Sequence, residues 1–180
     1  MFHDATTLWQ KAVAFHGHAC PGLAIGCGMV MVAARFLDLS ERSVDEEISC
    51  ITESDACCVD AAQALLGCTL GKGNLLLKLR GKAAMTFYDR AQRKGCRVLW
   101  QGTGDEDLPR EEKIRFILSP EGASRFVVQP IAYAPPSEAR LGRSLPCAAC
   151  GERTAEFMLR PHDGSLYCMD CWPDHSRILI

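Results

Sequence analysis

Two histidines and a cysteine stand at two-residue intervals near the start of the chain, as His16, His18 and Cys20 in the stretch FHGHACPG. In an extended segment, residues i, i+2 and i+4 project to the same side, so this spacing predicts that the three side chains face one point. Imidazole and thiolate together suit zinc, iron or another transition metal. The alternative is a buried structural cysteine beside two partly exposed histidines, and the spacing alone does not decide between the two.

A second group of candidate functional side chains lies in the stretch ESDACCVDAAQALLGCTLGKGN, residues 53–74. Cys57 and Asp60 are three residues apart and would share one face of a short helix, with Cys57 at its start, where a thiolate is favoured. Cys68 follows the predicted helix end and fits either the core or a site. Lys72 lies between two glycines in a loop that lacks the complete phosphate-binding pattern.

These two segments predict one metal site in the core. Its candidate ligands are His16, His18, Cys20, Cys57, Asp60 and Cys68. If the site is catalytic, the candidates for the reacting groups are Cys57, Asp60 and Lys72. Asp60 or a histidine would act as general base, and Cys57 or Cys20 as nucleophile or ligand, with Lys72 to neutralise an anion.

Two CxxC pairs near the end of the chain are the most specific pattern in the sequence. Cys147 and Cys150 form the first pair, and Cys168 and Cys171 form the second. Each CxxC turn points two thiolates at one place, and two such turns complete a closed tetrahedral zinc shell. A unit of about 35 residues buries too little surface to fold alone, so a structural zinc would decide whether it folds. The sequence therefore predicts a zinc ribbon, with a redox dithiol or two chance pairs as the alternatives.

The elements that must position these residues are helices and strands in mixed order. Helices are predicted from a cap at Asp4 to about residue 14 and over 21–37, 57–66 and 109–118, and strands over 47–52, 75–79, 83–88, 97–101 and 125–131. This order predicts an α+β fold, in which helices pack on a mixed, mainly antiparallel sheet and a small zinc ribbon follows. The glycines Gly22, Gly26 and Gly28 in the second helix predict close packing against another backbone.

We divide the chain into three parts. The predicted core domain covers residues 1–134, a linker rich in proline and serine covers 135–144, and the ribbon covers 145–180.

The composition narrows the class of protein. A net charge of -2 gives no bulk electrostatic case for binding nucleic acid or anionic lipid, and the ribbon has no basic patch interleaved with aromatic residues. The longest apolar run is too short to span a bilayer. Eleven cysteines without an export signal predict metal chemistry in a reducing compartment, so we expect a cytoplasmic protein.

Two long stretches of the sequence resemble a known family. FHGHACPGLAIG and ESDACCVDAAQALLGCTLGKGNLLLKLRGKAAMTFYDR are similar to the two signatures of the FmdE family, which is named for formylmethanofuran dehydrogenase, and two-domain members also end in a zinc ribbon. The resemblance implies an α+β core in a homodimer, and one cleft that gathers the matched polar residues and can hold a metal. These residues are His16, His18, Cys20, Cys57, Asp60, Gln63, Cys68 and Lys72. The chain departs from the family pattern at Cys27-Gly28, Cys58 and Leu79-Arg80.

The resemblance and the residues together predict three possible functions. The favoured one is a metal-binding accessory protein linked to a molybdenum or tungsten formylmethanofuran dehydrogenase or to molybdenum-cofactor metabolism, with structural zinc in the ribbon and a second transition metal, which can again be zinc, in the core. The second is a metal-dependent enzyme that uses the core cleft. The third is a metal-responsive regulator that acts through the ribbon. A complete shell of protein ligands around the core metal would favour storage, sensing or structure, and an open position would favour catalysis.

Overall fold

The structure, a computed structural model, describes residues 4–102 and 107–173. The chain divides into two compact units, Met1–Ala139 and Arg140–Ile180, which we describe separately. The last seven residues of the predicted ribbon lie outside the described residues.

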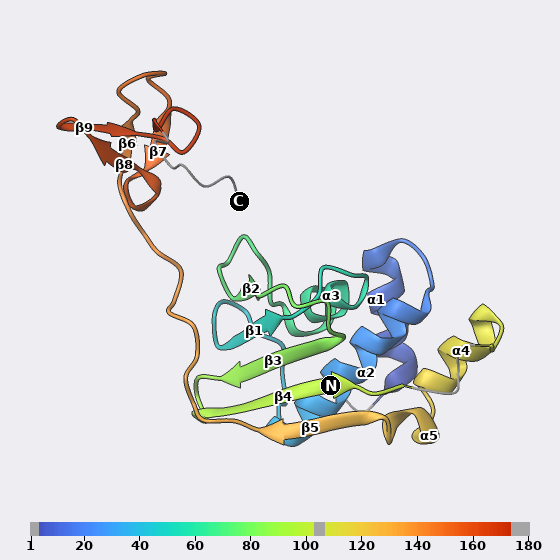
Figure 1. Ribbon diagram of the computed structural model, residues 1–180. Coiled ribbons are helices and arrows are strands. Elements are labelled where there is room, and N and C mark those ends of the chain that lie inside the picture. Colours follow the sequence, from blue (N-terminus) through green and yellow to red (C-terminus); the bar gives the residue numbers. More distant parts are fainter. Residues whose placement is uncertain (1–3, 103–106, 174–180) are drawn as a thin grey trace. The chain divides into compact units, whose positions relative to one another are not determined.

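A five-stranded mixed sheet forms the centre of the first unit (Figure 1). Its strand order is β2-β1-β3-β4-β5, with β1 and β2 parallel and the other pairs antiparallel. The predicted α+β class with a mainly antiparallel sheet is therefore confirmed. The strands are β1 (Ile48–Thr52), β2 (Leu75–Leu77), β3 (Ala84–Asp89), β4 (Lys94–Trp100) and β5 (Phe126–Pro130).

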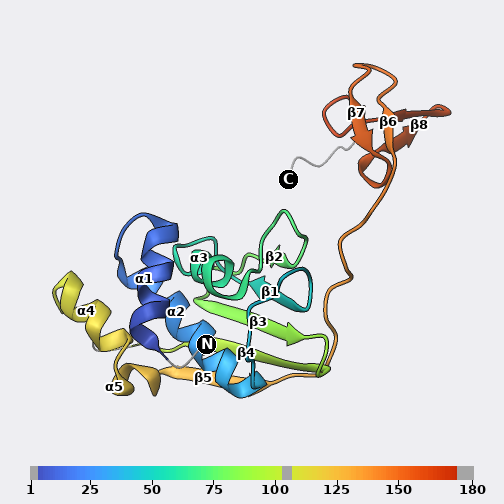
Figure 2. The ribbon, with the colours of Figure 1, turned by 180° about the vertical axis from the view of Figure 1, so that it is seen from behind.

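The longest helix, α2 (Pro21–Leu37), packs against β4 and runs beside α1 (Ala5–His16), as Figure 2 shows from behind. Proline at its first position has the backbone angle that a helix start needs, and the helix ends at Asp38 in a left-handed conformation. Ten of its residues are buried, so α2 is the central element of the core. Asp4 caps α1 as predicted, by accepting hydrogen bonds from the amides of Thr6 and Thr7.

The segment between these two helices is not an extended strand, and that expectation was wrong. His16 is the last residue of α1, and Gly17 closes the helix with a φ of 89°. Cys20 is already the N-cap residue of α2. The helical pattern of α1 thus continues two residues further than predicted, which leaves only a short turn between the two helices.

A short helix crosses close to α2. It begins as α3 (Cys58–Ala61) and continues as a π-helical turn over Ala62–Leu66, within the range predicted for one regular helix. Gly26 of α2 lies against it, since a Cβ atom at that position would be 2.2 Å from the carbonyl oxygen of Cys58. The predicted role of this glycine in close backbone packing is confirmed.

The remaining helices of the first unit lie in the chain between β4 and β5. Helix α4 (Arg110–Ile117) packs on α2 and is followed by the single turn α5 (Pro120–Ala123). Strand β4 begins three residues earlier than predicted, because the tight turn before it ends at Arg93, whose φ is 52°. Beyond β5 the chain stays on the first unit: the guanidinium of Arg90 donates to the carbonyl of Pro136, and the Ala139 amide donates to Glu46.

The second unit consists of two small antiparallel hairpins. Strand β6 (Ser144–Pro146) pairs with β7 (Arg153–Ala155), and β8 (Arg160–His162) pairs with β9 (Ser165–Tyr167). A 3-10 turn at Glu156–Met158 separates β7 from β8. The buried core of this unit contains only Cys147, Leu159 and Cys168 among the described residues, supported by a few partly buried neighbours.

Among the described residues, we find no helix with the length and hydrophobicity required to span a membrane.

Candidate metal centres

Three side chains from the two predicted segments meet in the first unit. One ligand atom each from His16, Cys20 and Cys57 lies within 4.8 Å of the other two. His16 comes from the end of α1, Cys20 from the start of α2, and Cys57 from the residue that precedes α3. We call this set the core group.

Local structure fixes Cys20 with its sulfur toward a helix N-terminus. Its Sγ accepts a hydrogen bond from the Leu23 amide at 3.3 Å, as a serine or threonine side chain would at an N-cap. An amide donor and the positive end of the α2 dipole both stabilise negative charge on the sulfur. The helix start therefore holds the Cys20 sulfur in place as a candidate ligand.

Glycine at position 22 lets the second thiol approach. A Cβ atom there would lie 3.2 Å from the Cβ of Cys57 and 3.9 Å from the Sγ of Cys20. Burial, followed by the neighbouring Cys20 thiol, raises the pKa of Cys57. Two adjacent thiols resist double ionisation, and a bound cation removes that penalty.

An acidic side chain orients the histidine of the core group. The Nδ1 atom of His16 is 2.7 Å from Oδ2 of Asp60, and the other carboxylate oxygen of Asp60 accepts a hydrogen bond from Gln63 at 3.0 Å. This contact leaves Nε2 of His16 facing Cys20, at 3.7 Å from its Sγ. Ligand bonds of about 2.0 and 2.3 Å in a tetrahedral zinc site give a nitrogen–sulfur separation of about 3.5 Å, so the spacing fits a shared metal.

Asp60 is thus placed as an outer carboxylate and not as one of the three grouped ligands. Metal-ligating histidines commonly donate their second ring N–H to a carboxylate, which fixes the ring and its tautomer. The sequence pattern pointed to Asp60 as a ligand or base, since spacing cannot show which groups bond to each other. The spacing also did not predict the hydrogen bond that the Leu23 amide donates to the sulfur of Cys20.

His18 lies beside the core group without joining it. Its ring contacts that of His16 at a tilt of 37°, with 4.4 Å between the centroids, and it is exposed. Because His16 ends a helix, the two rings do not project along a common strand face.

The two remaining candidates of the first unit contact a different part of the chain. The fully buried thiol of Cys68 donates to the carbonyl of Ile48, and burial raises its pKa to about 12. The ammonium group of Lys72 donates to the carbonyl of Val44 at 3.1 Å. Both residues therefore support the segment that enters β1, and the structure does not bring them into the core group.

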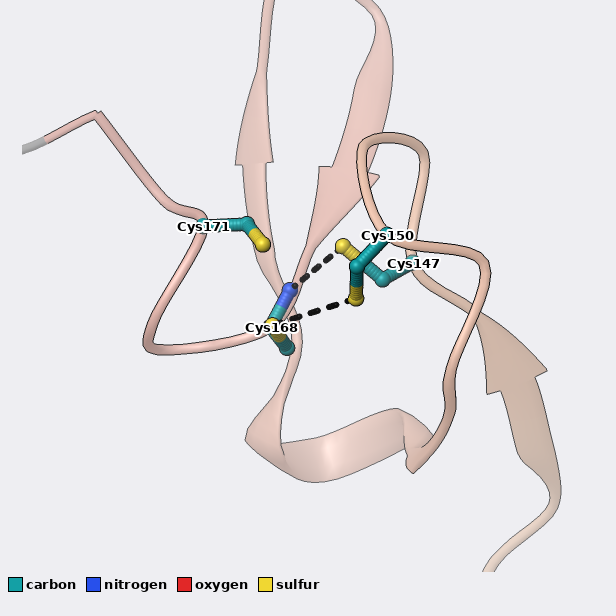
Figure 3. A group of neighbouring side chains, drawn as sticks. All are labelled: Cys147, Cys150, Cys168 and Cys171. Atoms are coloured by element: carbon teal, nitrogen blue, oxygen red, sulfur yellow. Dashed lines mark hydrogen bonds between the residues drawn. The ribbon is translucent and has the colours of Figure 1, made fainter.

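The four cysteines of the second unit do meet (Figure 3). Their sulfurs lie within 4.8 Å of one another, and those of Cys150 and Cys168 are 3.9 Å apart. Sulfur atoms at the corners of a zinc tetrahedron are about 3.8 Å apart, given zinc–sulfur bonds of about 2.3 Å. The four-cysteine cluster therefore has the spacing of a small zinc ribbon.

Backbone amides prepare this cluster for negative charge. The Cys168 amide donates to the sulfur of Cys147 at 3.3 Å. Hydrogen bonds from the amides of Cys150 and Cys168 lower the pKa of Cys147 to about 6. Competing bonds from the neighbouring sulfurs, with Cys168 first, raise the pKa of Cys171 to about 12. Four thiolates at this spacing require a cation, which agrees with a metal site.

The two candidate metal centres differ in the number of ligands that the protein offers to a metal. The second unit offers four thiol ligands, a complete tetrahedral set. Within the described part of the chain, the core group offers three, so one position of a tetrahedral metal would be filled by an outside ligand.

Comparisons with known proteins place the chain beside one family. The profile of the family described as FmdE, Molybdenum formylmethanofuran dehydrogenase operon, matches residues 15–122. A probable S-adenosyl-L-methionine-binding protein from Archaeoglobus fulgidus is 41% identical over 96 residues, which are 52% of this chain and 26% of that protein. This chain therefore spans about a quarter of the length of that relative.

A solved structure has the same fold. It is the crystal structure of a tungsten formylmethanofuran dehydrogenase FmdE-like protein from Syntrophus aciditrophicus. The TM-score is 0.69 with 23% sequence identity, and the match covers 93% of this chain and 91% of the other.

Proposed function

This chain belongs to the FmdE family, and we propose that it is a metal-binding accessory protein linked to a molybdenum or tungsten formylmethanofuran dehydrogenase or to molybdenum-cofactor metabolism. The observation that carries the proposal is the core group, in which one imidazole and two thiols from three elements lie within 4.8 Å of one another. Such a mixed nitrogen and sulfur set selects a transition metal such as zinc or iron over magnesium or calcium.

Each neighbouring residue has a defined task in this proposal. Asp60 holds the proton on Nδ1 of His16, so that Nε2 is the free ligand atom. The Leu23 amide stabilises the Cys20 thiolate. Gly22 leaves space for Cys57 beside Cys20. A bound metal would supply a Lewis-acidic position for an outside ligand.

A second candidate function is a metal-dependent enzyme, and the three-ligand core group favours it. Catalytic zinc sites typically use three protein ligands and keep the fourth position for water or substrate, whereas structural sites are closed. In that case Cys57 is a ligand and Asp60 is a positioning residue.

Three further features complete the proposal. The four-cysteine cluster holds a structural zinc, because its donor set and spacing fit that ion. The protein forms a homodimer, as the family resemblance implies, and sedimentation at micromolar concentration should give twice the chain mass. It acts in the cytoplasm, where a reducing environment keeps its eleven cysteines from forming disulfides.

The decisive experiment measures binding at the core group directly. Cobalt titration of the protein should produce thiolate-to-metal absorption for the core site, and Cys57→Ser should remove that contribution while the signal of the four-cysteine cluster stays. His18→Gln, which alters an exposed neighbour outside the group, should change the cobalt affinity by less than the roughly 10-fold that loss of an outer partner of a ligand costs. Equal cobalt binding by the native protein and the Cys57→Ser variant would refute the proposed site.

The same titration separates the two candidate functions. X-ray absorption that shows two sulfurs, one nitrogen and an exchangeable oxygen ligand would favour the enzyme. A shell closed by a fourth protein ligand would favour the accessory role.

A further inference from the structure

A basic hollow lies on the face of the sheet opposite to α2. In β3, the side chain of Phe87 points into the core, so its neighbours Thr86 and Tyr88 point to the other face of the sheet. In β4, Cys96 is buried in the core, and Arg97 therefore points to the same second face. On this second face a hollow of about 600 Å³ opens. Its lining residues are Ile51, Glu53, Lys78, Arg80, Lys82, Thr86, Tyr88, Arg97, Ile131 and Ala132.

The backbone fixes the rim of this hollow. The Lys78 amide donates to the carbonyl of Thr52, and the Arg80 amide donates to the carbonyl of Glu53, both at 2.8 Å. The segment after β2, with the cationic side chains of Lys78, Arg80 and Lys82, is therefore tied to the end of β1. All three cations are exposed.

The positive charge of the hollow is not balanced by the residues around it. Glu53 is the one carboxylate in the lining that the structure describes, and it accepts two hydrogen bonds from Arg97, at 2.6 and 2.9 Å. The hydrogen bonds from Arg97, followed by the more distant charges of Lys82 and Lys78, lower the pKa of Glu53, and its one negative charge stands against four cations in the lining. In the parts of the chain that the structure describes, Lys78, Arg80 and Lys82 form no ion pair within 4.0 Å.

Apart from the hydroxyl groups of Thr86 and Tyr88, the remaining lining is apolar. Ile51, Ile131 and the ring of Tyr88 contribute carbon surface, and burial raises the pKa of Tyr88, which keeps its hydroxyl neutral. A volume of about 600 Å³ lies within the range of small-molecule sites, which is about 300–1,000 Å³. Three cations without an acidic partner, set beside apolar surface, match a molecule that has a polyanionic end and an uncharged body.

We propose that this basic hollow binds a phosphorylated small organic molecule of about nucleotide size, at a site separate from the core group. Lys78, Arg80 and Lys82 contact the phosphate oxygens, because ammonium and guanidinium groups form strong charge-assisted hydrogen bonds with them. The Glu53–Arg97 pair forms the fixed polar wall, and Ile51 with Ile131 covers the uncharged body. No residue of the core group lines the hollow.

The test uses the full chain in its metal-loaded form, with ADP, pyrophosphate and adenosine as probes in isothermal titration. ADP should bind, pyrophosphate should bind more weakly, and adenosine should show no binding at millimolar concentration. The double variant Lys78→Gln/Lys82→Gln should weaken ADP binding at least tenfold. Lys94→Gln is the matched control, since Lys94 is exposed, bonds to Gln92 and lies outside the lining. It should bind ADP like the native protein.

Two additional measurements keep the result specific. Cys57→Ser should retain ADP binding. Loss of binding in this variant would mean that the phosphate binds to the core metal and not in the hollow. The metal content and melting temperature of the double variant should match those of the native protein, which shows that it folds.

The proposal is overturned if neither ADP nor pyrophosphate binds, if the double variant binds ADP as the native protein does, or if Cys57→Ser abolishes binding. It is also overturned if the double variant changes only the sedimentation mass, since the hollow would then be a contact between two copies of the chain. These outcomes leave the proposed metal site untouched, because cobalt binding at the core group is measured independently.

Discussion

At the scale of single residues, the Asp60 carboxylate decides which nitrogen of His16 faces the two thiols. It contacts Nδ1 at 2.7 Å, and the side chain of His16 is only 10% exposed, so the ring has little freedom to turn. A free imidazole would divide its proton between both nitrogens, and only one of the two tautomers leaves Nε2 free to bind a metal.

Asp60→Asn should therefore weaken metal binding at the core group by about 10- to 100-fold, the usual effect of losing an outer carboxylate. The amide keeps the size of the side chain but lacks the negative charge that holds the proton on Nδ1. Competition with a chelator of known affinity measures the change. Asp38→Asn serves as control, since Asp38 is exposed and has a φ of 54°, which asparagine also adopts readily. An unchanged affinity in Asp60→Asn would remove the orienting role.

A second prediction at this scale concerns Glu47. Its carboxylate accepts hydrogen bonds from the Asp45 amide and the Ser43 hydroxyl, and these bonds lower its pKa from 4.5 to about 2. A lowered folded-state pKa stabilises the protein above pH 4.5, and this contribution is lost as the pH falls toward 2. Glu47→Gln should thus lower the melting temperature at pH 7, and the difference from the native protein should shrink between pH 4.5 and 2.

The comparison is made as a difference between the two proteins at each pH, because acid also releases metals from thiolates in both. A difference in melting temperature that stays constant from pH 7 to pH 2 would contradict this account.

The residue types of the core group were predictable, but their roles were not. His16, Cys20 and Cys57 were candidates from their chemistry, and the structure brings them together. The reason given for the first two, a shared face of an extended strand, was wrong, since a helix end and a helix start place them. Cys68 follows a left-handed glycine that turns the chain, and no local pattern shows that its thiol then points at a backbone carbonyl.

At the scale of elements, the contact between α2 and α3 sets the position of Cys57 relative to Cys20. Gly26 lies one helical turn beyond Gly22, and a Cβ atom at Gly26 would be 2.2 Å from the Cys58 carbonyl oxygen and 2.7 Å from its Cα. Backbone atoms cannot move aside as a flexible side chain does. An added methyl group must therefore push the two elements apart.

Gly26→Ala should lower the free energy of unfolding of the first unit by about 1–3 kcal/mol, the usual cost of overpacking. It should also weaken metal binding at the core group, because Cys57 moves with α3. Urea denaturation and cobalt titration measure the two effects. Gly71→Ala is the matched control, since no atom lies within 4 Å of a Cβ atom at that position. Equal stability of the two variants would show that the contact between the elements is not tight.

The long elements followed from the sequence, and the irregular ones did not. Helix α2 matches the predicted range because a proline start and a continuous apolar pattern define it. The π-helical turn and the parallel pairing of β2 with β1 depend on tertiary contacts, which neither periodicity nor turn residues encode. The early start of β4 depends on a turn conformation at a non-glycine residue, Arg93.

At the scale of the whole molecule, the two units should depend on metal to different degrees. The first unit has a continuous core of buried side chains from helices and sheet. The buried core of the second unit, in its described part, consists of Cys147, Leu159 and Cys168, two of which are candidate ligands. In zinc-finger peptides, a structural zinc contributes about 10–16 kcal/mol, so its loss should unfold the second unit and leave the first intact.

We expect two metal equivalents per chain. Cys147→Ser should remove one of them and abolish amide exchange protection in the second unit, because three ligands and a small core cannot hold the hairpins together. Cys57→Ser should remove the other and leave protection of both units largely unchanged. Elemental analysis gives the metal content, and hydrogen exchange with mass spectrometry gives the protection of each unit. A single equivalent that disappears entirely in Cys147→Ser would mean that the core group holds no metal, since the native protein would then have no ion left for His16, Cys20 and Cys57.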